Sequence, residues 1–218
     1  LKKYKITKFL ANNCNYKKNM IFYSKGGSMN RSEIKEKAKG MIKGNLWYIW
    51  KMYLVVFAVA FVIGLVEGLF AEVPVISFLV ALASMVVSAA LSVGAIYYIV
   101  KFVRNEKIEI NDFFEFAKKH WVISLLTTLL AGLFILGGTI LLVIPGIVVS
   151  IGLSFVSYVV VDNPELSAME IIKKSWNLTN GHKVDVFVFG LSFIGWIILS
   201  PLTLGLLYIW LIPYMLVA

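Results

Sequence analysis

The chain has 218 residues, of which 60% are apolar and only 15% are charged, and its mean hydropathy is +0.84. A soluble domain is about half apolar and about a quarter charged, so much of this chain must face something other than water. Its length allows one domain. The composition argues against an ordinary soluble domain and predicts an all-α, polytopic membrane helical bundle.

The net charge of +9 is concentrated near the N-terminus, because residues 1–28 hold seven lysines and no acidic residue. Subtracting these seven from the 21 basic residues leaves 14, against 12 acidic residues. A basic tail can bind nucleic acid or anionic lipid. However, the chain opens with Leu1, residues 1–28 lack the apolar core of a signal peptide, and codons for Lys25-Gly26-Gly27 before Met29 can resemble a bacterial ribosome-binding site. We interpret 1–28 as a disordered, non-native translated leader and expect no nucleic-acid partner.

Long uncharged runs divide residues 29–218, which we expect to form a single integral membrane domain. A crossing helix takes about 20 apolar residues. The runs 121–161 and 186–218 are long enough for two helices each, broken at Pro145-Gly146 and at Pro201. The predicted spans are about 47–70, 73–100, 121–144, 146–161, 184–200 and 202–218, with one span plus a re-entrant segment as the alternative for the last two. The final run has no polar tail, so we expect the natural chain to continue.

The basic residues that follow Met29 predict the topology. They lie before the first span, between the second and third, and between the fourth and fifth, whereas the opposite turns contain no Lys or Arg. Since Lys and Arg favour cytoplasmic loops, both termini are predicted to be cytoplasmic. Each basic segment also has the spacing of an amphipathic helix, which predicts three such helices on the cytoplasmic side.

Two groups of residues are candidate contact sites. The first combines paired lysines with tryptophan and predicts contact with anionic lipid headgroups, although topology and anchoring alone would explain it too: Lys118, Lys119, Trp121, Lys173, Lys174 and Trp176. The second consists of small residues at three- or four-residue spacing and predicts close helix packing, with a polar pore lining as the alternative for the serines: Gly64, Gly68, Ser84, Ser88, Ser92, Gly146, Ser150 and Ser154.

Motifs for catalysis are missing from the sequence. There is no phosphate-binding loop and no HExxH motif. The cysteine and histidine residues, Cys14 and two histidines, are few for a metal site. We interpret Glu67 and Glu72 as acids at a solvated helix end rather than as a cation site. We therefore expect no cofactor and a non-enzymatic protein that organises or binds membrane lipids, protein partners or further copies of itself. The alternative is a small-solute or peptide transporter, or a membrane subunit of one.

Several segments resemble a family of bacterial integral membrane proteins, the domain of unknown function 975 (DUF975) family. The segments that carry the resemblance are Met29-Asn30-Arg31-Ser32-Glu33-Ile34-Lys35 with Lys43-Gly44-Asn45, Leu141-Leu142-Val143-Ile144-Pro145-Gly146-Ile147, Ser175-Trp176-Asn177-Leu178-Thr179-Asn180-Gly181, Leu191-Ser192-Phe193-Ile194-Gly195-Trp196, and Pro213-Tyr214. More distantly, the chain is similar to the membrane domain attached to some glycerophosphodiester phosphodiesterases. The resemblance implies a multi-pass protein of the bacterial cytoplasmic membrane and implies no activity.

Overall fold

A computed structural model describes residues 31–106, 109–199, 201–203 and 207–217, so the predicted leader, 1–28, lies outside the described residues. Every regular element in these ranges is helical, which confirms the predicted all-α class there. The elements are α2 (Arg31–Ile42), α3 (Leu46–Leu69), α4 (Pro74–Val103), α5 (Ile110–Leu141), α6 (Val143–Gly152), α7 (Val156–Asp162), α8 (Ala168–Thr179), α9 (Lys183–Leu191), α10 (Ile194–Leu199), η1 (Pro201–Thr203) and α11 (Tyr208–Val217).

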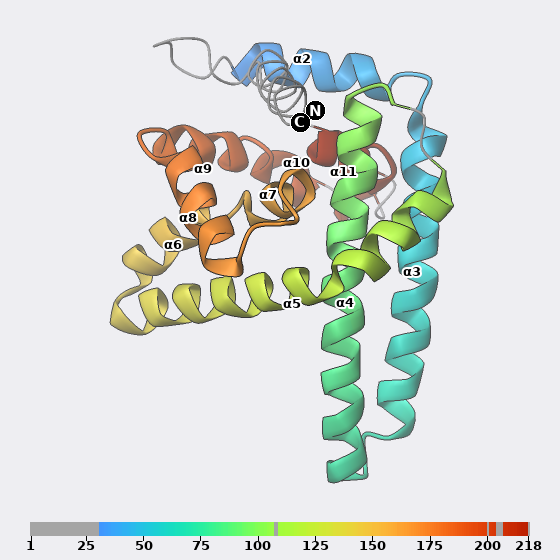
Figure 1. Cartoon of the computed structure of the whole chain (residues 1–218). Coiled ribbons are helices and arrows are strands. Elements are labelled where there is room, and N and C mark those ends of the chain that lie inside the picture. Colours follow the sequence, from blue (N-terminus) through green and yellow to red (C-terminus); the bar gives the residue numbers. More distant parts are fainter. Residues whose placement is uncertain (1–30, 107–108, 200, 204–206, 218) are drawn as a thin grey trace, which may run out of the picture.

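Helices α3 and α4 form a long antiparallel hairpin that extends away from the other helices (Figure 1). With 24 and 30 residues they are about 36 and 45 Å long. Pro74 starts α4 because the first helical position needs no N–H donor. Glu67 lies near the end of α3 and Glu72 in the turn that follows, whereas Lys51 and Lys101 lie toward the opposite end of the hairpin. The hairpin therefore has an acidic end and a basic end.

Helix α5 crosses α4 at a close contact that Gly94 makes possible. A Cβ atom at Gly94 would lie 3.0 Å from the carbonyl oxygen of Phe113 and 3.1 Å from the Cβ of Ala117. Beyond this crossing, His120 has non-helical dihedral angles and α5 bends. Figure 1 shows the rest of α5, together with α6, lying crosswise to α3 and α4. In a helical bundle the helices run alongside one another. The described helices do not all have this arrangement.

Four helical segments are long and apolar enough to cross a membrane: α3, α4, α5, and Val143–Asp162 (α6 with α7). A fifth is obtained if α8 and Lys183–Leu199, bent by 80° against each other, count as one span. The described part of the chain is therefore compatible with a multi-pass membrane protein. The predicted count of six is not confirmed, because the segments predicted as spans 184–200 and 202–218 are broken into α9, α10, η1 and α11, none longer than 10 residues.

The predicted set of three separate amphipathic helices is not confirmed either. Helices α2 and α8 are separate elements, but the middle segment is the first part of α5. Helix α8 begins after Ser167, whose side chain accepts a hydrogen bond from the backbone N–H of Glu170, while the Glu170 carboxylate accepts from the Ser167 N–H. This capping box sets the start of α8 at Ala168.

Two apolar clusters hold the described helices together. The first lies beneath α2 and joins it to α3, α4, the start of α5 and α11 through Ala38, Ile42, Ile49, Tyr98 and Leu211, among others. The second joins α4 to the α6–α8 region through Val93, Leu153, Val160 and Ile171, among others. Large parts of α3, α4 and α5 belong to neither cluster and expose apolar side chains. A large exposed apolar surface marks contact with a membrane or another protein.

Candidate functional site

The break between α6 and α7 leaves one backbone carbonyl free to bind side chains of α8. The N–H of Val156 donates to the carbonyl of Leu153 at 3.1 Å, instead of to the carbonyl of Gly152 four residues earlier. The Gly152 carbonyl accepts a hydrogen bond from the hydroxyl of Ser175 at 3.0 Å. The Thr179 hydroxyl lies 3.4 Å from the same carbonyl, but its shorter bond, 3.0 Å, is to the carbonyl of Trp176 in its own helix. Because a buried carbonyl without a partner is costly, the Ser175 hydroxyl fixes α8 against the end of α6.

Gly152 also provides the space that Trp176 occupies. A Cβ atom at Gly152 would lie 2.6 Å from the ring atom Cζ3 of Trp176, closer than unbonded carbon atoms approach. The Nζ atom of Lys183 lies 3.0 Å from the centroid of the Trp176 ring, a cation–π contact. The indole is therefore held by contacts from the end of α6 and the start of α9.

Next to this junction, α5, α6 and α8 border a half-open cavity of about 520 Å³. Its lining is mostly apolar: Phe134, Val149, Leu153, Met169, Ile172 and Trp176. The polar side chains in the lining are Lys173 and Asn177, both on α8. Figure 1 shows α8 between α5 and α9, beside α6. An apolar cavity with a few polar groups at one place is the usual form of a small-ligand site, and its volume lies within the usual range of about 300–1,000 Å³.

The structure separates the two predicted Lys-Lys-x-Trp segments. Lys173 and Trp176 line the cavity, but Lys174 does not: it is half-buried and donates to the side-chain oxygen of Asn163 at 2.7 Å. Lys118, Lys119 and Trp121 lie at the bend of α5 and are exposed. Since Lys119 is 15 residues from Phe134 on the same helix, these residues lie roughly 20 Å from the cavity.

Of the glycines predicted to pack helices together, some lie at a contact in the structure and others do not. Gly146 lies at a real contact, because a Cβ there would lie 2.9 Å from the Cα of Thr139 across the α5–α6 turn. Gly64 and Gly68 are exposed, and an added Cβ at either would meet no atom of the described residues within 4 Å, so their packing role stays a prediction. Figure 1 shows the end of the α3–α4 hairpin where the two helices join extending away from the other helices.

The hydroxyls of three predicted serines make local hydrogen bonds. Ser92 and Ser150 each donate to a carbonyl three residues earlier in their own helix, and Ser154, in the break after α6, donates to the Ile151 carbonyl, all at 2.8 Å. Ser84 is half-buried and Ser88 is exposed. Ser124 on α5, which the predicted pattern did not include, makes a contact between helices: its hydroxyl donates to the Ala89 carbonyl on α4 at 2.6 Å.

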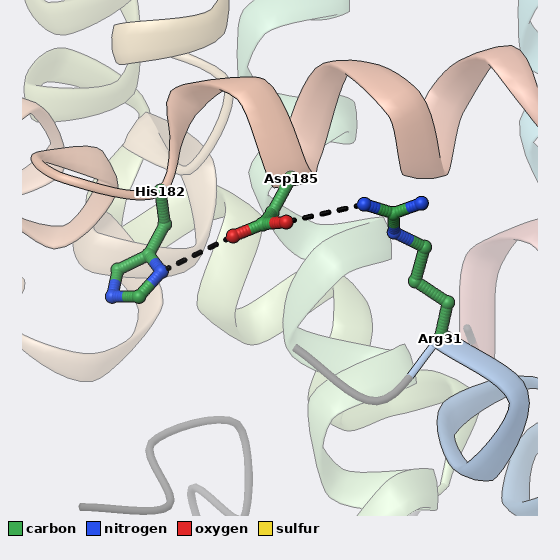
Figure 2. A network of polar contacts seen from close by, with 3 residues as sticks. All are labelled: Arg31, His182 and Asp185. Carbon is green, nitrogen blue, oxygen red and sulfur yellow. Dashed lines mark hydrogen bonds and ion pairs between the residues drawn. The ribbon is translucent and has the colours of Figure 1, made fainter. Parts of the chain in front are cut away.

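A polar network connects α2 to the start of α9 (Figure 2). Figure 2 shows the Asp185 carboxylate between the guanidinium of Arg31, at 3.2 Å, and the Nδ1 atom of His182, at 3.4 Å. The Arg31 side chain is 41% exposed, and ion pairs of this exposure contribute about 0–1 kcal/mol. The network therefore orients α2 more than it stabilises the fold.

Basic side chains of α2 also lie over aromatic rings of the C-terminal helices. The Nζ of Lys35 is 4.7 Å from the ring centroid of Phe193, and that of Lys39 is 5.9 Å from that of Tyr214. Burial, and secondarily the charge of Lys39, lowers the pKa of Lys35 below its ordinary value. Lys51 lies in the same way near Trp47 and Tyr48. These ammonium groups are already engaged by neighbouring rings.

Among the described residues, no group of three or more His, Cys, Asp or Glu side chains is placed to hold a metal ion. Two stretches of the chain, residues 29–141 and 133–218, match the family described as "Protein of unknown function (DUF975)". The chain belongs to the DUF975 family. This confirms the family resemblance found in the sequence. Searches of curated proteins and of solved structures returned no match, so the more distant resemblance to the glycerophosphodiester phosphodiesterase membrane domain stays a prediction.

The residues that sequence reasoning missed in this DUF975 protein are Gly152, Ser175 and Thr179. Ser175 and Thr179 are four residues apart, which places them on one face of α8, and both are buried. Two hydroxyls on the buried face of an amphipathic helix signal a hydrogen-bond acceptor opposite. The sequence does not say that the acceptor is the carbonyl of Gly152, because that carbonyl is freed only by the break after α6.

Proposed function

We propose that this protein is a non-enzymatic integral membrane protein of the bacterial cytoplasmic membrane that binds anionic lipid on its cytoplasmic side. The observation that supports it most is the division of the lysines. Lys35, Lys39, Lys51 and Lys183 lie over aromatic rings. Lys118, Lys119 and Lys173 are exposed and, unlike those four lysines, lie over no aromatic ring within the described ranges. Exposed lysines beside apolar helices suit the phosphate level of a membrane.

The orientation in the membrane is part of the same proposal. The α3–α4 hairpin is long enough to cross the hydrocarbon core of about 30 Å. Its basic end, with α2 beside it, faces the cytoplasm, and the turn with Glu67 and Glu72 faces outward, as the positive-inside rule requires. Both termini are then cytoplasmic. The short helices after Lys183 enter the membrane without crossing it individually, since 10 residues of helix span only about 15 Å.

Changing Lys118, Lys119 and Lys173 together to Gln is expected to weaken binding of phosphatidylglycerol strongly. Each lysine near an anionic surface contributes about 1 kcal/mol, so the triple variant should bind roughly 100-fold more weakly. Native mass spectrometry of the full chain in mild detergent, titrated with phosphatidylglycerol, measures the effect. The matched control variant also loses three positive charges, by Gln substitutions at Lys37, Lys51 and Lys174. Lys37 pairs with Glu33 at 2.6 Å, and the other two lie against a ring or an amide.

Equal loss of lipid in both triple variants would show that overall charge, not the exposed side chains, attracts lipid. Unchanged binding in the first variant would contradict the proposal outright. The transporter alternative predicts instead a co-purified small solute or peptide whose retention ignores these lysines. The described cavity gives that alternative little support, because its lining includes none of Ser84, Ser88 and Ser92.

Single cysteines are expected to report the proposed orientation. Cys14 is the one cysteine of the chain, so a Cys14→Ser background has no thiol. In intact cells, Glu72→Cys should react with a membrane-impermeant maleimide, and Lys43→Cys and Asn180→Cys should react only after permeabilisation. All three positions are exposed and make matched probes. Labelling of the Lys43 or Asn180 site in intact cells would contradict the orientation.

A further inference from the structure

We propose that the cavity between α5, α6 and α8 holds one acyl chain of an anionic phospholipid, with the phosphate at Lys173. This inference rests on the lipid binding proposed above and names the site and the kind of ligand. It starts from the α8 spacing: Met169, Ile172 and Trp176 are three and four residues apart and face the cavity together. Lys173 and Asn177, four residues apart, share one edge of it.

The lining suits a hydrocarbon chain better than a peptide. An extended peptide carries an N–H and a C=O in each residue, and these need hydrogen-bond partners along the whole groove. The side chains around the cavity offer polar groups only at Lys173 and Asn177. The backbone of the surrounding helices is engaged in its own hydrogen bonds, and the Gly152 carbonyl already accepts from Ser175. A chain without polar groups therefore fits the interior, and an anionic group fits the edge.

The charges around the edge favour phosphate over a neutral headgroup. Lys173 is exposed and lines the cavity, whereas Lys183 lies outside the lining and is engaged by the ring of Trp176. The nearby acid, Glu170, is held by Ser167, whose hydroxyl and backbone N–H both donate to its carboxylate, at 2.6 and 2.9 Å. A phosphate at this edge therefore meets lysine charge, and the neighbouring carboxylate is turned toward the helix cap.

The α5 part of the cavity lining adjoins exposed apolar surface. Phe134 lines it and is 44% exposed, and its neighbour Leu133 is 64% exposed. In the proposed orientation such exposed apolar side chains contact lipid. An acyl chain can then enter sideways from the bilayer, with no opening of the helices.

The test fills the cavity and counts the lipid that remains. The full-length protein in mild detergent is mixed with phosphatidylglycerol and phosphatidylcholine of identical chains and analysed by native mass spectrometry. Wild type is expected to keep one phosphatidylglycerol after collisional stripping, and Met169→Trp to lose it. Leu126→Trp, at an exposed position of α5 outside the lining, is the matched control and should keep it. Lys173→Gln should lower the preference for phosphatidylglycerol over phosphatidylcholine about fivefold.

Because Met169→Trp can fail to fold, a second variant, Met169→Phe, fills the cavity with a smaller side chain. This variant should lose part of the bound phosphatidylglycerol and keep an unchanged melting temperature. Retention of the lipid in Met169→Trp and Met169→Phe would overturn the inference, as would equal retention of both lipids unaffected by Lys173→Gln. Failure here is separable from failure of the proposed function. If Lys118→Gln and Lys119→Gln weaken lipid binding while filling the cavity does not, the function stands and the cavity site is wrong.

Discussion

Replacing Gly152 by alanine is expected to destabilise the protein by about 1–3 kcal/mol, the usual cost of forcing extra atoms into a packed contact. The new Cβ would lie 2.6 Å from Cζ3 of Trp176. The indole cannot easily withdraw, since its helix is tied to the Gly152 carbonyl by Ser175 and Lys183 lies on its ring. Relief of the clash therefore requires α8 to move as a whole.

Gly132→Ala is the matched control for this variant. Gly132 lies inside α5, and a Cβ there meets no atom within 4 Å, so alanine should stabilise the helix by up to about 1 kcal/mol. The two substitutions thus have opposite expected signs in denaturant unfolding of the detergent-purified protein. Adding Trp176→Leu to Gly152→Ala should recover part of the loss, a coupling that a double-mutant cycle measures. Equal effects of both alanines, with no coupling to residue 176, would refute the assigned contact.

Gly146→Ala is expected to have an effect of similar size for a different reason. Here the added Cβ would lie 2.9 Å from the Cα and 3.0 Å from the backbone nitrogen of Thr139. Backbone atoms have no rotamer to change, so α5 and α6 must separate at their turn. The expected loss of stability is again about 1–3 kcal/mol.

Two neighbouring glycines complete a graded series for this contact. A Cβ at Gly138 would lie 3.3 Å from the Cα of Gly146, a tighter approach than usual, whereas one at Gly137 meets nothing within 4 Å. Alanine should therefore destabilise most at 146, less at 138, and stabilise slightly at 137. The melting temperatures of the three variants in one detergent measure this order. Any other order would show that the α5–α6 approach differs from the one described.

Some features of this DUF975 protein could be predicted from the sequence alone because their signals are local. The spans predicted at about 47–70 and 73–100 agree closely with α3 and α4 as observed, Leu46–Leu69 and Pro74–Val103. Uncharged length and a proline at a helix start act within a few residues, so no tertiary contact is needed to read them. The same holds for the amphipathic pattern of α2 and α8.

The residues after Lys183 show the limit of prediction from local sequence. Their composition is as apolar as that of α3, yet they form short helices separated by breaks. Apolar composition indicates burial or lipid contact, but it does not say whether a helix continues. Pro201 contributes a break that the sequence shows, while the break between α9 and α10 follows no proline. Two further spans were therefore predicted where the structure has broken segments.

The sequence by itself determined the helical class, the family, the long α3–α4 hairpin and the separation of basic from acidic ends, since each depends on composition or on neighbouring residues. Only the tertiary structure decided which small residues are contacts and which lysines lie over aromatic rings. Gly64 and Gly146 carry the same local signal, but one faces open space and the other faces the backbone of Thr139. The physical reason is that a contact needs two surfaces, and the second surface belongs to another helix, whose position arises from the bend at His120, the crossing at Gly94 and the break after Gly152.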